Sequence, residues 1–250
     1  YNFTMKIIIA PAKKLDTCNN KLSKKMNFSL INEAQQLIDL LQKKTPQEVK
    51  EIMGLSDNLT NLNVARFNEW DVNNLNTFNA ILMFQGDVYK GLSAHAFSEK
   101  EMDFAQANLR ILSGLYGILK PLDVILPYRL EMGTKIKNEF GNTLYDFWSG
   151  KLQAFLTNEM KQGDFLVNLA SNEYSKALKL SSFPYKVVTP IFKDFKNGKL
   201  KIISFYAKRA RGEMCNFIIR NQIKNISDLK LFNHLGYSYQ EENEEMIFVR

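Results

Sequence analysis

The stretch L-R-I-L-S-G-L-Y-G-I-L-K-P-L-D-V-I-L-P-Y-R-L-E-M-G, residues 109–133, carries the strongest local signal in this chain. It sets glycines, prolines, tyrosines and cations into an apolar run. It follows a helix that Ser98 is expected to cap, with Glu101 completing a capping box. We expect this helix to end near Leu112, a glycine-bearing turn to follow, and Pro121 to open a short second helix. This order predicts a helix-hairpin-helix-like element near residues 98–126.

Two interpretations of this stretch are open. In a helix-hairpin-helix element, backbone N–H groups of the turn bind a DNA phosphate without reading the base sequence. Arg110, Lys120 and Arg129 would then add positive charge. The alternative is a tight structural turn buried under aromatic side chains. Short glycine turns are common, so the local sequence by itself favours the structural turn.

The composition is that of an ordinary globular protein with a basic charge balance. The chain has 250 residues, of which 45% are hydrophobic and 24% are charged. Its formal net charge of +7 favours an anionic partner such as nucleic acid or a phosphorylated metabolite. No apolar run reaches transmembrane length, so we expect no membrane partner. Residues 1–4 are expected to be a cloning remnant, with a single domain over residues 5–250.

Cysteine and histidine are scarce, which bears on the compartment and on metal binding. Cys18 and Cys215 form no disulfide framework, and we expect reduced thiols and a cytoplasmic protein. His95 and His234 are far apart in the sequence, and no Cys/His cluster occurs. We therefore expect no metal site and no cofactor. A protein that handles iron through a carboxylate site is one functional hypothesis, and it is weaker than the enzyme and the DNA-binding hypotheses described below.

Helices and scattered strands alternate without a regular βαβ rhythm. Apolar periodicity, capping signals and the Asn-Gly turn at 197–198 decide the assignment. Strands are predicted at 6–10, 80–84 and 165–169, hairpins at 187–192 with 200–205 and at 236–240 with 246–249, and helices from 29, at 46 onward, and at 56–70, 98–112, 144–160 and 208–221. We predict an α+β fold in a single domain, with a mixed sheet and surrounding helices.

A basic segment covers residues 203–212. Lys208, Arg209 and Arg211 fall where a strand is expected to end and a helix to begin. Cations at a helix N-terminus oppose the macrodipole, and an anionic ligand would offset that repulsion. Tyr206 could add stacking on a nucleic acid. The alternative is a solvated basic face, and the two interpretations are evenly matched.

Polar residues follow the strand predicted at 165–169. An enzyme acting on a nucleotide or nucleic acid would use the polar set Asn168, Ser171, Glu173, Tyr206 and Lys208. The structural alternative makes Ser171 a helix N-cap and the residue after it a turn residue. This alternative is favoured for the segment itself. The enzyme hypothesis is the second of the three.

Ordered stretches along the chain resemble the YaaA family of bacterial peroxide-stress proteins. They are I-I-I-A-P-A-K-K-L-D (7–16), A-R-F (65–67), G-D-V-Y-K-G-L (86–92), D-F-A-Q (103–106), residues 109–123 and 127–133 of the opening stretch, V-N-L-A-S-N-E-Y (167–174) and K-I-I-S-F-Y-A-K-R-A-R-G (201–212). Together they extend over almost the whole chain from Met5. Lys14 stands where the family also uses threonine, which makes Lys14 a weak functional candidate.

The resemblance implies an α+β domain that binds double-stranded and distorted or branched DNA through a positively charged cleft and a helix-hairpin-helix motif. It implies protection from hydrogen peroxide, associated with lowered free iron and less oxidative DNA damage. No catalytic activity is firmly attached to the family, so a non-enzymatic, sequence-tolerant DNA-binding protein is the favoured hypothesis. The resemblance also turns the balance for residues 109–133 toward DNA contact. The expected DNA-binding residues are Lys13, Arg110, Ser113, Gly114, Tyr116, Gly117, Lys120, Arg129, Lys208, Arg209 and Arg211.

Overall fold

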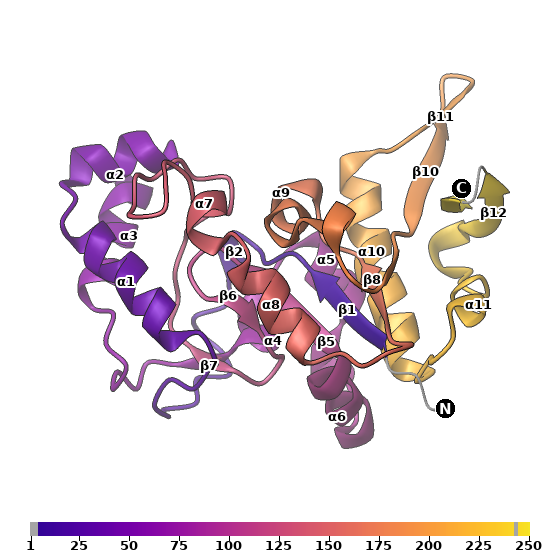
Figure 1. Cartoon of the computed structure of the whole chain (residues 1–250), viewed down its shortest axis with the longest axis horizontal. Helices are drawn as coiled ribbons and strands as arrows, with labels where there is room; N and C mark the ends of the chain where they lie inside the picture. Colours follow the sequence, from indigo (N-terminus) through magenta and orange to yellow (C-terminus); the bar gives the residue numbers. More distant parts are fainter. Residues whose placement is uncertain (1–4, 243–244) are drawn as a thin grey trace.

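A mixed sheet of five strands lies at the centre of the computed structural model, which describes residues 5–242 and 245–250 (Figure 1). The strand order is β6-β5-β1-β8-β9, with β6 antiparallel to β5 and the other neighbours parallel. Their bounds are β1 Met5–Ile9, β5 Leu109–Ser113, β6 Gly117–Leu119, β8 Phe165–Asn168 and β9 Lys186–Val188. Every residue of β1, β5 and β8 is buried. Such continuous burial is typical of parallel strands covered on both faces.

Helices of the N-terminal third form one end of the molecule (Figure 1). They are α1 Ile31–Gln42, α2 Pro46–Met53 and α3 Asp57–Asn68. Helix α1 buries the apolar face that its sequence period predicts, including Leu37 and Leu41. Thr45 caps α2 through a complete capping box with Glu48, which accounts for the helix start predicted at residue 46.

A second sheet forms the opposite end, together with the C-terminal helices (Figure 1). Its strand order is β11-β10-β13-β12, with β10 Ile191–Lys196, β11 Lys199–Lys201, β12 Ser238–Glu242 and β13 Glu245–Val249. Asn197 and Gly198 both adopt positive φ in the turn between β10 and β11, as this hairpin type requires. Helices α10 Ser204–Arg220 and α11 Ile226–Leu229 complete this end. The hairpin predicted at 236–240 with 246–249 is confirmed, and so is the turn at 197–198. The bounds predicted for the strands on either side of that turn, 187–192 and 200–205, are wrong. Residues 186–188 join the central sheet as β9, and the second strand ends at Lys201, because α10 begins at Ser204.

Short elements connect these parts. They are β2 Lys14–Leu15, β3 Phe78–Asn79, α4 Ala80–Met83, β4 Phe84–Gln85, α5 Asp87–Leu92, α6 Glu99–Asn108, β7 Val124–Ile125, α7 Leu144–Trp148, α8 Lys151–Asn158 and α9 Asn172–Ser175, with short 3-10 turns at 94–96, 176–178, 180–182 and 234–236. The buried apolar side chains of all parts form one continuous core. The prediction of an α+β fold with a mixed sheet in one domain is confirmed. The remnant predicted at residues 1–4 lies outside the described residues.

The helix-hairpin-helix element near 98–126 is not confirmed. Helix α6 ends at Asn108, and Leu109 already belongs to strand β5, which pairs with β1. Pro121 lies in a turn closed by the Lys120 N–H, which donates to Asp123 Oδ2 at 2.8 Å. Within the described residues, no helix follows α6 before Leu144. The apolar spacing fitted a helix and a buried strand equally well, and pairing with β1 decides for the strand.

Two other predicted elements differ from the structure. The segment predicted as a strand at 80–84 is helix α4 for its first four residues and only then enters β4. The helix predicted at 144–160 is divided into α7 and α8 at Ser149 and Gly150. At 80–84 the short apolar run fits a strand and a helix equally well. At 149–150 the helix is interrupted because Gly150 adopts a positive φ of 77°.

Candidate functional site

A cavity of about 830 Å³ opens where the parallel strands β1 and β8 end. The chain that leaves β1 next enters the sheet at β5 on one side of β1, whereas the chain that leaves β8 enters β9 on the other side. The loops after the two strands therefore diverge. In open sheets of parallel strands, ligands bind in the crevice formed at such a point. These two loops, helices α5 and α10, and the segment 189–192 line the cavity.

The loop after β1 brings two lysines to the cavity, Lys13 and Lys14. Lys13 Nζ lies 2.8 Å from Glu131 Oε1, and Arg129 Nη2 lies 3.0 Å from the same oxygen. Burial raises the pKa of the Glu131 carboxyl, but hydrogen bonds from Lys13 and Arg129 outweigh it and lower the pKa overall. Lys13 and Arg129 therefore share an internal counter-ion. Lys14 is exposed, and no acidic side chain in the described part of the chain pairs with it.

Helices α5 and α10 form one wall of the cavity and touch through glycines. A Cβ atom on Gly91 would lie 2.5 Å from the carbonyl oxygen of Arg209. A Cβ atom on Gly212 would overlap the carbonyl oxygen of Val88. Any larger side chain at either position would force the two backbones apart. The glycines of two motifs that are distant in the sequence thus serve the contact that builds this wall.

Helix α10 brings two cations to the cavity, the exposed Lys208 and the half-buried Arg211. Burial lowers the pKa of the Arg211 guanidinium, which nevertheless stays charged at neutral pH. No carboxylate or carbonyl oxygen of the residues described here pairs with Arg211. A partly desolvated cation without a counter-ion costs free energy that an anionic ligand would offset.

The start of α10 changes the interpretation of the basic segment. The helix begins at Ser204 rather than at Lys208, so the predicted cations lie beyond its first turn. Because the macrodipole acts mainly within the first turn, it gives no reason for a ligand at these side chains. Arg209 Nη2 lies 3.0 Å from Glu213 Oε1, and Tyr206 stacks on Arg250 with 4.4 Å between the guanidinium carbon and the ring centre. Neither Arg209 nor Tyr206 lines the cavity.

The loop after β8 supplies Ser171 and Glu173 to the cavity. Glu173 Oε1 accepts a hydrogen bond from the Gly133 N–H at 3.1 Å, which joins this loop to the segment after β7. Asn168 is buried beneath the loop instead. Its Oδ1 accepts from the Ala170 N–H at 3.1 Å, and its Nδ2 donates to Thr189 Oγ1 at 3.3 Å. Asn168 therefore orders the loop without lining the cavity.

The turn at residues 113–117 is buried in the core. Ser113, Gly114, Tyr116 and Gly117 have no exposed side, since they form the hairpin between β5 and β6. A Cβ atom on Gly114 would overlap the carbonyl oxygen of Leu130. Aromatic hydroxyls complete the turn: Tyr116 donates to the Leu126 carbonyl at 3.0 Å, and the Ser113 and Tyr128 hydroxyls lie 2.6 Å apart. The glycines serve close packing here.

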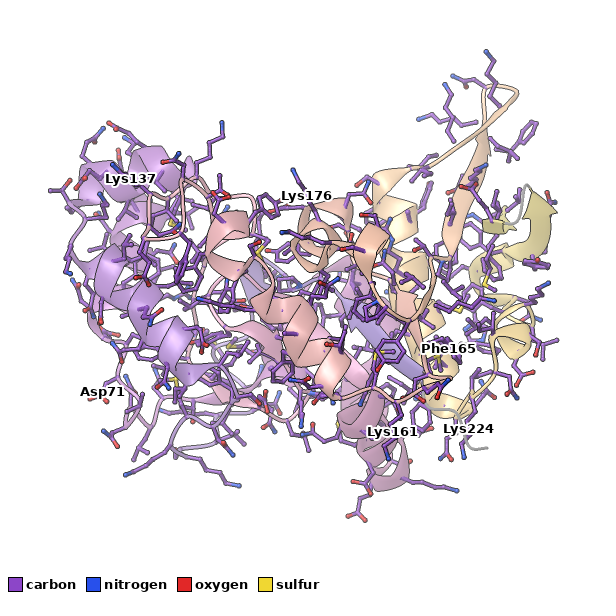
Figure 2. The ribbon with its side chains drawn as sticks, in the orientation of Figure 1. Asp71, Lys137, Lys161, Phe165, Lys176 and Lys224 are labelled. Carbon is purple, nitrogen blue, oxygen red and sulfur yellow. The ribbon has the colours of Figure 1, made fainter. Side chains whose placement is uncertain are left out.

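Charged side chains gather near the amino ends of β1 and β5, away from the cavity. Arg110 is only 2% exposed, and its Nε donates to Glu159 Oε2 at 2.6 Å. Lys120 Nζ lies 3.4 Å from Glu159 Oε1, and Lys6 Nζ donates to the Ala107 carbonyl at 2.7 Å. Burial and then the nearby Arg110 charge lower the pKa of Lys6 to about 8. Arg110 and Lys120 are thus separated from the other predicted DNA-binding residues. Figure 2 shows Phe165, at the amino end of β8, on the lower side of the molecule.

Asp87 is a cavity residue that our reading of the sequence did not select. Asp87 begins helix α5 and lines the cavity. Its carboxylate is half-buried and has no hydrogen-bond or ion-pair partner among the described residues. The two glycines around it were the available signal, because they indicated a close approach to another segment.

The described part of the chain shows no group of three or more His, Cys, Asp or Glu side chains placed to hold a metal ion. None of its helices combines the length and the apolar character needed to cross a bilayer.

Comparison with known proteins connects this fold to a family. The family model for "Peroxide stress protein YaaA" matches residues 5–243. A UPF0246 protein of Teredinibacter turnerae is 48% identical over 240 residues, covering 94% of each chain. UPF0246 proteins of a Shewanella species and a Marinomonas species are 46% and 44% identical, covering 95% and 98% of this chain and 95% and 97% of theirs. These matches span the cavity and both ends of the fold, and the chain belongs to the YaaA family of peroxide stress proteins.

Proposed function

We propose that this protein binds DNA in peroxide-stress defence, by contacting the phosphate backbone with little preference for base sequence. The observation that carries the proposal is the convergence of cations from separate segments on one cavity. Lys14 comes from the loop after β1, and Lys208 and Arg211 come from α10. None of the three has an acidic partner among the described residues. Such cations release condensed counterions when they neutralise phosphates.

The hairpin of β10 and β11 extends the basic surface beyond the cavity. Lys196, Lys199 and Lys201 are exposed on it, and Ile202, which follows β11, lines the cavity. In Figure 2 several side chains near the hairpin tip end in nitrogen and point away from the body of the molecule. A backbone bound at the cavity would therefore continue along these lysines.

Not all predicted DNA-binding residues enter this proposal. Lys13 and Arg129 share the single carboxylate of Glu131, and Arg209 is paired with Glu213. Arg110, Lys120 and the turn at 113–117 are buried or lie away from the cavity. The proposal therefore rests on the unpaired cations around the cavity and on the hairpin lysines.

A mobility-shift titration tests the proposal with duplexes of about 30 base pairs that differ in base sequence. The double variant Lys14→Glu with Lys208→Glu should weaken binding to every sequence alike, by roughly a hundredfold at low salt. The control Lys43→Glu with Lys100→Glu makes the same change of charge at exposed positions directly after α1 and on α6, neither of which lines the cavity. Equal weakening by both double variants, or none by the first, would refute a DNA contact at the cavity.

We also propose that DNA binding limits iron-dependent DNA damage in the cytoplasm. Support comes from the family's peroxide-stress role and from Cys18 and Cys215, which are both free thiols. Cells that lack the gene should regain survival in hydrogen peroxide with the wild-type chain and with the Lys43/Lys100 control. They should not regain it with the Lys14/Lys208 variant at equal protein level.

One observation favours a second candidate, an enzyme acting on a nucleotide or nucleic acid. Ser171, Glu173 and Lys208 of the predicted polar set line the same cavity. The test is product analysis after incubation with DNA and with mononucleotides. Turnover that is lost in Glu173→Gln, which keeps an acceptor for the Gly133 N–H, would favour this candidate over DNA binding alone.

A further inference from the structure

The interior of the cavity differs from its rim. Leu169, Tyr174 and Phe192 form buried apolar walls, with Tyr89 beside them. Phosphates on the outside of an intact duplex would use only the exposed cations and would leave these walls without a ligand. A pocket that joins apolar walls to a few charged groups instead fits a small ligand with both kinds of surface. Its volume of about 830 Å³ lies within the range of small-molecule sites.

Arg211 gives the interior one charged end. Its guanidinium is half-buried, its pKa is lowered by burial, and it lacks a carboxylate partner in the described part of the chain. Surface lysines can be solvated without a ligand, but a desolvated arginine has lost part of its water. A planar guanidinium also matches the oxygens of a phosphate in two parallel hydrogen bonds.

Acidic groups give the same cavity hydrogen-bond acceptors. Asp87 is half-buried and has no described partner, and Glu173 uses one carboxylate oxygen for the Gly133 N–H. These carboxylates would repel a ligand that carries only negative charge. They suit a ligand whose anionic part is separate from a part with N–H donors.

From these three features we propose that the cavity binds a single nucleotide unit. Its phosphate contacts Arg211 and Lys208, its base packs against the tyrosines, and N–H groups of the base donate to Asp87 or Glu173. This inference deepens the proposed function. It rests on that function when the bound nucleotide is part of DNA. An unpaired nucleotide turned out of the base stack and a free mononucleotide present the same chemistry.

Titration calorimetry with the four deoxynucleoside monophosphates tests the site, with inorganic phosphate and a deoxynucleoside as comparison ligands. At least one monophosphate should bind about tenfold or more tightly than inorganic phosphate, since only it uses the apolar walls. Arg211→Gln should lose about tenfold or more of that affinity. Arg220→Gln, which changes another arginine of α10 outside the cavity, should bind as the wild type does. Thermal unfolding confirms that each variant is folded.

A second pair of variants guards against an indirect effect of Arg211→Gln. Asp87→Asn should change which base binds best, because it exchanges an acceptor for a group that also donates. Ser171→Trp should abolish mononucleotide binding, because it fills the cavity without a change of charge. Monophosphates that bind no better than phosphate, or a wild-type affinity in Arg211→Gln, would overturn the inference.

The source of the nucleotide is determined by comparing the binding of two duplexes, one fully paired and one with a single unpaired nucleotide. Tighter binding of the interrupted duplex, lost in Arg211→Gln, assigns the site to DNA. Equal binding of both duplexes, with mononucleotide binding retained, assigns it to free nucleotide, and either result upholds the site. Failure of the proposed function is separate, since it appears as absent binding to the fully paired duplex.

Discussion

Gly212 of helix α10 packs directly on the carbonyl group of Val88 in helix α5. Alanine at this position would normally favour a helix over glycine by about 1 kcal/mol. Here the added Cβ would overlap the Val88 carbonyl oxygen, and backbone atoms cannot rotate away as side chains do.

Gly212→Ala should therefore lower the free energy of unfolding by about 1–3 kcal/mol, since the helices must separate. Urea denaturation followed by circular dichroism measures the change. Asn61→Ala, at an exposed position of α3, is the control and should shift stability by less than about 0.5 kcal/mol. A Gly212→Ala protein at least as stable as the wild type would show that α5 and α10 do not need this contact.

Removal of the Glu159 charge should destabilise the fold, because Arg110 would remain buried without its counter-ion. Arg110 is 2% exposed and bonds to Glu159 at 2.6 Å. Loss of one partner of a buried pair costs about 3–5 kcal/mol. We expect a loss of that order for Glu159→Gln in urea denaturation at neutral pH. Asp57→Asn, which breaks an exposed pair with Lys50, should change stability much less.

Lys6 should make the protein more stable as the pH rises above 8. Its pKa is about 8 in the folded chain, whereas the ordinary value of 10.5 applies to the unfolded chain. The unfolded chain therefore binds the proton more tightly. Stability then increases with pH between these two values and does not change below the lower one. From pH 7 to pH 9.5 we expect a gain of about 1–2 kcal/mol from this group. Lys6→Met should lack the gain, and an equal gain in both proteins would contradict the assignment to Lys6.

The salt dependence of DNA binding should report the cavity lysines individually. Lys14→Gln and Lys208→Gln each remove one phosphate contact under the proposed function. Each should make the slope of log affinity against log salt less steep by about 0.9, and the double variant by about twice that. Filter binding from 50 to 200 mM salt measures the slope. Lys43→Gln should leave it unchanged, and an unchanged slope in the double variant would exclude these lysines from the interface.

Elements with strong local signals were predictable from the sequence. Residues close together in the chain account for strands β1 and β8, the capping boxes at Thr45 and Ser98, the turn at 197–198 and the hairpin of β12 and β13. The opening stretch was not predictable in this way. Arg110 has an acidic partner that only the tertiary fold brings near, so its burial in β5 could not be read locally.

The cavity was partly predictable. Ser171, Glu173 and Lys208 were selected because polar residues follow a strand or border a helix. Asp87 was missed because its role depends on helix α5 packing against α10, a contact between segments far apart in the chain. For the same reason the sequence did not reveal that Lys13 and Arg129 share Glu131 as their counter-ion.

The glycine contacts between α5 and α10 also bear on how this family can diversify. Backbone atoms, and not cavity side chains, set the spacing of this wall. Under the proposed nucleotide site, substitutions at Asp87, Lys208 or Arg211 would thus alter which ligand is preferred while the frame around them keeps its dimensions. Relatives that retain both glycines but differ at these three positions would be expected to share one architecture and differ in ligand.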